Sequence, residues 1–94
     1  MSTWRWVAPA PIEAAHALWT LTPVTGKAWT ITVGREGRDP DQFTWHLIWA
    51  IYRASEPDLL RLALAYPGYA SAVMCAKDGD LDRLREAAGH YVKT

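Results

Sequence analysis

Prolines divide this chain into short segments more firmly than any other feature of its sequence. Pro11, Pro40, Pro57 and Pro67 each stand at the front of a segment whose apolar residues recur with helical spacing. Proline suits the first turn of a helix, where its missing N–H has no intrahelical partner, and it disfavours helix in the residue before it. The sequence therefore predicts several short helices with sharp boundaries.

We expect five helices, each of which begins at a proline or at a capping residue. They cover residues 11–19, 40–54, 56–66, 68–76 and 81–88. Asp39 is expected to cap the second helix, with Pro40 at its first position, and Ser55 is expected to cap the third. Asp78–Asp80 is a junction at which Gly79 ends one helix and Asp80 starts the next. Residues 90–94 are expected to fray.

The segment 40–54 is apolar around most of its helical circumference. Only Gln42, His46 and Arg53 fall within a narrow polar arc, which Ala50 borders. A helix that is apolar over so much of its surface usually lies at the centre of its domain. We therefore expect a central hydrophobic helix near residues 40–54.

Two segments have the alternating pattern of β-strands. In Trp29–Val33 the apolar residues alternate with two threonines, and Thr3–Val7 places Trp4 and Trp6 on one face. Strands and helices together predict an α+β fold in which two short strands pack on about five helices. The length of 94 residues suits a single small globular domain spanning residues 1–94.

Charge and composition exclude several classes of protein. Ten basic and ten acidic residues give a formal net charge of zero, which removes the long-range attraction that nucleic acids or anionic membranes exploit. The apolar run 43–52 is about half the length of a membrane span, and the first residues lack the apolar core of a signal peptide. Cys75 is the one cysteine, so no intrachain disulfide forms. We expect a cytoplasmic protein that binds neither membranes nor nucleic acids.

Metal-binding patterns are incomplete. The three histidines lie far apart, with no cysteine or acidic residue at zinc spacing beside them; they are His16, His46 and His90. Residues 78–82 space three aspartates as an EF-hand does, but Arg83 and Gly89 occupy the positions that require glycine and glutamate. Helix capping explains these aspartates instead. We predict no metal site and no cofactor.

Catalytic and phosphate-binding patterns are also missing. Cys75 lies in a run of small residues typical of close helix packing, and Ser71 has no nucleophile-elbow motif around it. The loop 34–37 has too few glycines for a phosphate cradle. The segment 66–69 joins two helices in the outline of a helix-turn-helix, but the second carries no basic residue before Lys77. The sequence therefore indicates a protein that is not an enzyme.

Six tryptophans are more than a domain of this size can bury completely. The pattern gives core positions to three of them, namely Trp19, Trp29 and Trp45. The other three, Trp4, Trp6 and Trp49, lack an obvious buried position. Exposed tryptophan and arginine are the residues that dominate binding at protein interfaces. We therefore predict an interaction surface formed by Trp4, Trp6, Trp49, His46 and Arg53.

Part of the chain resembles a group of known sequences. The stretch 39–70 contains the runs Thr44–Leu47, Tyr52–Ala54 and Leu62–Tyr69, and it resembles small uncharacterised proteins of actinobacteria and their phages. The lack of asparagine and the fifteen alanines favour a GC-rich genome of the same kind. This resemblance covers about a third of the chain and implies no catalytic residue. It implies a phage-encoded protein acting in the host cytoplasm.

These observations favour a non-enzymatic protein–protein interaction module. It would be an accessory or host-interaction protein that binds itself or another protein through an aromatic surface. One alternative is a small-molecule-binding domain or minor enzyme whose pocket contains Trp45, Trp49 and either His16 or His46. A second alternative is a virion assembly factor.

Overall fold

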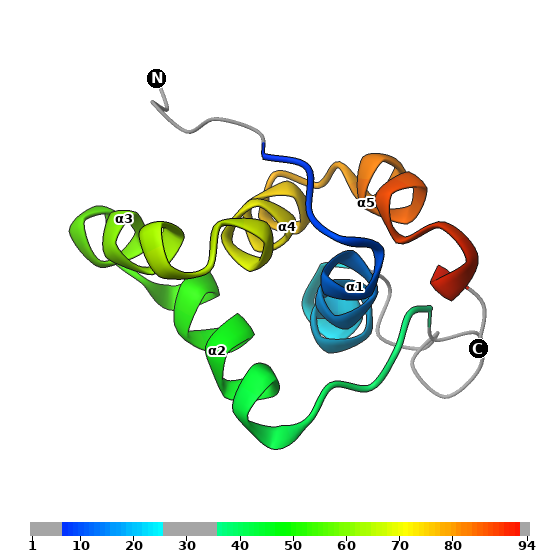
Figure 1. Ribbon diagram of the computed structural model, residues 1–94, viewed down its shortest axis with the longest axis horizontal. Helices are drawn as coiled ribbons and strands as arrows, with labels where there is room; N and C mark the ends of the chain where they lie inside the picture. Colours follow the sequence, from blue (N-terminus) through cyan, green and yellow to red (C-terminus); the bar gives the residue numbers. More distant parts are fainter. Residues whose placement is uncertain (1–6, 26–35, 93–94) are drawn as a thin grey trace.

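The computed structural model describes residues 7–25 and 36–92. Their regular elements are five α-helices and one terminal 3₁₀ helix (Figure 1). In chain order they are α1 Pro11–Thr25, α2 Gln42–Arg53, α3 Glu56–Ala65, α4 Pro67–Lys77, α5 Leu81–Ala88 and η2 Gly89–Val92.

The prediction of an α+β fold is wrong. The described ranges contain helices and connecting loops but no strand, so this part of the chain is all-helical. The predicted strand 29–33 and all but the last residue of the predicted strand 3–7 lie outside those ranges. Val7 has no regular structure, and its backbone N–H donates to Oγ of Ser71 in α4. The core is therefore built by helices packing on helices.

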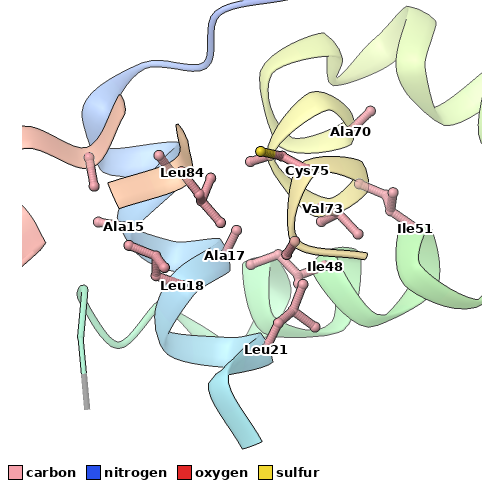
Figure 2. Close-up of a cluster of buried hydrophobic side chains, with 14 of the residues drawn as sticks. Ala15, Ala17, Leu18, Leu21, Ile48, Ile51, Ala70, Val73, Cys75 and Leu84 are labelled. Carbon is pink, nitrogen blue, oxygen red and sulfur yellow. The ribbon is translucent and has the colours of Figure 1, made fainter. Parts of the chain in front are cut away.

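Helices α1 and α4 form the centre of the molecule. α1 packs against α4, α5, α2 and η2, while α4 packs against α1, α2, α3 and α5 (Figure 1). Small residues allow this close approach, and six alanines of the two helices are buried: Ala14, Ala15, Ala17, Ala70, Ala72 and Ala76. Larger side chains fill the remaining space between the helices. Figure 2 shows Leu18 and Leu21 of α1, Ile48 and Ile51 of α2 and Leu84 of α5 in this core.

Helix α2 is not central, contrary to the sequence prediction. It packs on α4 and α1 with one face, on which Leu47, Ile48 and Ile51 are buried. Phe43 and Trp45 on its other sides are 60% and 41% exposed. The apolar circumference suggested burial on all sides, but α1 and α4 already occupy the centre and leave α2 at the edge (Figure 1).

Helix boundaries follow the predicted pattern with two shifts. α1 continues to Thr25 instead of ending near Trp19, because the next turn is held by burial of Thr20 and Leu21. α2 begins two residues later than expected, since the side chain of Asp41, and not that of Asp39, accepts the backbone N–H of Thr44 at 3.0 Å.

The junction between α4 and α5 agrees with the prediction. Gly79 adopts a positive φ of 83°, and Asp80 caps α5 by accepting the backbone N–H of Arg83 at 3.3 Å. Cys75 is buried beside this turn, where its thiol donates to the carbonyl of Asp80. Burial raises the pKa of this thiol, as expected of a structural cysteine.

Two segments outside the five α-helices pack against α1: the 3₁₀ helix that follows α5 and the loop that precedes α2. Residues 89–92 form η2 and pack on α1, although the segment from residue 90 onward was expected to fray. On the other side, Gly37 crosses α1 so closely that the backbone N–H of Arg38 donates to the carbonyl of Ala15 at 3.2 Å. Glu36 then accepts two hydrogen bonds from Nε of Arg85 at 2.8 Å, which ties this loop to α5.

Candidate interaction surface

The outer face of α2 holds most of the described candidate residues. His46 and Arg53 are exposed and Trp49 is half-buried, so the helix brings together three of the five residues singled out from the sequence. Trp4 and Trp6 lie outside the described residues. The face is available because α2 buries only the opposite side of its circumference.

Aromatic rings form a continuous row along α2. Trp45 meets the His46 ring edge-on at 5.0 Å between centroids and the Trp49 ring at 6.1 Å. Trp49 in turn meets Tyr52 at 5.5 Å. The guanidinium of Arg53 lies over the Trp49 ring, 5.2 Å from its centroid, in a cation–π arrangement. Each of these rings therefore contacts at least one neighbouring ring or guanidinium on the same helix.

The structure reverses the roles expected of two tryptophans. Trp45, to which the pattern gave a core position, is 41% exposed, whereas Trp49 packs partly against the core. The indole N–H of Trp49 is buried and has no acceptor among the described residues. Trp45 and Trp49 lie one helical turn apart on α2. Which of the two side chains is more buried depends on where α1 and α4 pack against this helix. The sequence alone does not specify that position.

Sequence reasoning missed a second aromatic edge. Phe43 lies on the other side of the polar arc and contacts Tyr66, with ring centroids 6.3 Å apart. Phe43 is 60% exposed and Tyr66 is 36% exposed. The sequence analysis did not single out either residue, because apolar spacing does not show which of several apolar sides of a helix meets the core.

An open groove of about 640 Å³ adjoins this face between α2 and α3. Its lining combines small apolar residues with charged ones, namely Ala50, Arg53, Ala54, Ser55, Asp58, Arg61 and Leu62. The alternative of a small-molecule pocket required Trp45, Trp49 and a histidine around one cavity. This groove contains none of them.

The histidine with a shifted pKa lies elsewhere, in a polar cluster among α1, α2 and α4. Nδ1 of His16 and the hydroxyl of Tyr69 share a hydrogen bond of 2.8 Å, and the rings stack in parallel. Burial lowers the pKa of His16, and the carboxylates of Asp41, Asp39 and Glu13 oppose that shift. Burial also raises the pKa of Tyr69. This side-chain hydrogen bond links α1 to α4.

The described part of the chain contains neither a group of metal-ligating side chains nor a helix that could span a membrane. No three histidine, cysteine or acidic side chains there are grouped as metal ligands. None of the described helices is long and apolar enough to cross a membrane.

Comparisons with known proteins leave the family open. No family profile matches this chain, and no curated protein or solved structure matches it either. The resemblance to small proteins of actinobacteria and their phages therefore stays a prediction from the sequence.

Proposed function

We propose that this chain is a non-enzymatic protein–protein interaction module that docks a partner protein on the outer face of α2. One observation carries the proposal: Phe43 and Trp45 are 60% and 41% exposed on a helix whose opposite face is buried in the core. Large aromatic side chains in water are unfavourable for an isolated domain, and an extended group of them is typical of a binding site.

The composition of this face suits a protein partner. Its polar arc of Gln42, His46 and Arg53 lies between Trp45 on one side and Phe43 on the other. Tryptophan and arginine are enriched among the residues that dominate interface energies. With a net charge of zero, the chain would hold its partner through buried apolar area and local hydrogen bonds instead of long-range attraction.

The origin of the partner follows only from the sequence. If the chain is phage-encoded, as its resemblance implies, the partner is a protein of the phage or of its host. Co-purification with assembled particles would indicate the virion assembly alternative, whereas capture from uninfected cytoplasm would indicate a host partner.

Photo-cross-linking tests the proposal at the residue level. A photoreactive phenylalanine analogue placed at Phe43 should form a defined adduct with a partner protein in host lysate, identified by mass spectrometry. Trp45→Ala should reduce capture by about tenfold or more, as expected when a central aromatic contact is lost.

A matched control distinguishes specific binding at this face from nonspecific binding to exposed apolar residues. Val7 is an apolar residue of similar exposure, 45%, whose backbone is bonded to Ser71 of α4 and not to α2, so Val7→Ala should leave capture unchanged. The proposal fails if no adduct forms in lysates of infected and uninfected cells, or if both alanine variants reduce capture equally.

A further inference from the structure

The groove between α2 and α3 contains one positive charge that the fold leaves uncompensated. The two helices meet at one edge of the molecule, where only Ala54 and Ser55 separate them (Figure 1). Two arginines and one aspartate are in the lining of the groove. Asp58 pairs with Arg61 at 3.1 Å, whereas the side chain of Arg53 forms no ion pair or hydrogen bond with the described residues.

Stacking on Trp49 positions the guanidinium of Arg53 and leaves its hydrogen-bond donors free. Cζ of Arg53 lies over the Trp49 ring, 5.2 Å from the ring centroid. The ring itself packs partly against the core and meets Tyr52 edge-on at 5.5 Å. A stacked guanidinium uses its flat face, while its N–H groups lie in its plane. A carboxylate can therefore still bind Arg53 at two points.

The rest of the groove suits the aliphatic part of an acidic side chain. Ala50 and Ala54 contribute only methyl groups to the lining, and Leu62 adds an apolar side chain from α3. The volume of about 640 Å³ is within the range of roughly 300–1,000 Å³ that is typical of binding sites. Asp58 accepts hydrogen bonds from both Ser55 and Arg61, so an incoming carboxylate meets no unpaired negative charge in this lining.

A partner on the α2 face must also compensate Arg53. Because the guanidinium lies over the Trp49 ring, a protein that covers the aromatic row removes water from Arg53 as well. A guanidinium that loses water without gaining an acceptor is strongly unfavourable. Arg53 is the one charged side chain of α2 at neutral pH, and no carboxylate of this helix can supply that acceptor.

We infer that the partner inserts an aspartate or glutamate side chain into the groove, where its carboxylate accepts two hydrogen bonds from Arg53. This inference rests on the proposed function and adds the chemistry of the partner, which is a protein segment with an acidic residue beside apolar ones. The apolar residues cover the aromatic row, and the acidic residue fixes the orientation of the segment across α2.

Selection from a library of short random peptides displayed on yeast, with the whole chain as bait, tests the inference. We expect the selected peptides to contain aspartate or glutamate next to aromatic or aliphatic residues. Selection on Arg53→Gln should lose the acidic preference and keep the apolar one. Arg38→Gln is the matched control, because Arg38 lies over the Tyr91 ring at 5.4 Å but outside the groove lining. It should leave the acidic preference unchanged.

A selected peptide and a counterpart with an amide in place of its carboxylate measure the ion pair in solution. Arg53→Gln should weaken binding of the acidic peptide by about tenfold and leave binding of the amide peptide unchanged. Arg53→Lys keeps the charge but lacks the planar fork, so it should restore only part of the affinity. Since Arg53 is exposed, these variants should keep the helical circular dichroism of the chain.

Three results would overturn the inference: no selected peptide, selected peptides without an acidic preference, or equal effects of Arg53→Gln and Arg38→Gln. Failure of the docking face gives a different pattern, in which no adduct forms at Phe43 and Trp45→Ala leaves binding of the selected peptides unchanged. An adduct at Phe43 together with peptides that do not depend on Arg53 would overturn only the acidic contact.

Discussion

The inner helices α1 and α4 and the outer helices α2 and α3 use hydrophobic residues in opposite ways. The inner pair buries small side chains such as Ala15 and Ala72 completely, whereas the outer pair exposes large ones such as Phe43 and Leu64. Close packing of two helix backbones requires small residues, and a helix rich in aromatic rings does not fit between them. Burial in this protein is therefore decided by size as much as by hydrophobicity.

The comparison predicts that one substitution has opposite consequences in the two regions. Leu84 is fully buried against α1, so Leu84→Ala should lower the free energy of unfolding by about 2–5 kcal/mol through lost contacts and a cavity. Leu64→Ala at the outer edge should change it by at most about 0.5 kcal/mol. Urea denaturation measures both. Similar losses at the two positions would mean that α3 is covered within the single chain.

A glycine pair tests how tightly the inner region is packed. A Cβ at Gly37 would collide with the carbonyl oxygen of Ala15 in α1, whereas one at Gly79 would meet open space. Both glycines have a positive φ, so alanine is strained at either position. We expect Gly37→Ala to cost about 3 kcal/mol and Gly79→Ala about 1 kcal/mol in thermal or urea unfolding. Equal losses of unfolding free energy for the two variants would show that the loop before α2 can move away from α1 at little energetic cost.

Two histidines extend the comparison to pH. Burial lowers the pKa of His16 in the folded chain below its ordinary value of 6.5, so the unfolded chain binds more protons near that pH. The stability that depends on neutral His16 is therefore fully present above pH 6.5 and is lost as the pH falls through the folded pKa.

The matched variants for this prediction are His16→Gln and His46→Gln. We expect His16→Gln to flatten the pH dependence of the unfolding midpoint below about pH 6.5, and the exposed His46→Gln to leave it unchanged. An unchanged pH profile in His16→Gln would contradict the inner position of that ring.

The smallest expected effect concerns two tryptophans on one helix. Trp45 is 41% exposed and Trp49 is packed partly against the core, so acrylamide should quench them to different extents. Trp45→Phe should remove more of the quenchable fluorescence than Trp49→Phe, with little change in stability. Addition of a docking partner should then protect Trp45 and abolish the difference.

Local signals in the sequence predicted the helices well and their arrangement poorly. Pro11 and Asp80 marked helix starts correctly, because caps and prolines act within one turn of the backbone. Ser55 occupies the N-cap position of α3, but its side chain does not form the expected capping hydrogen bond. The polar arc of α2 and the buried thiol of Cys75 also agree with the structure. The predicted central position of α2, the core position of Trp45 and the α+β fold were wrong, because each depends on residues distant in sequence.

The sequence by itself determined that the described segments form helices and where most of these helices begin, although it assigned the cap of α2 to Asp39 instead of Asp41. These properties depend on neighbouring residues and on residue type. Only the tertiary structure decided that α1 and α4 take the centre and that Phe43, Trp45, Leu60 and Leu64 lie outside. The physical reason is that helix packing selects for side-chain size between close backbones, and periodicity along one helix carries no information on which neighbour will meet it.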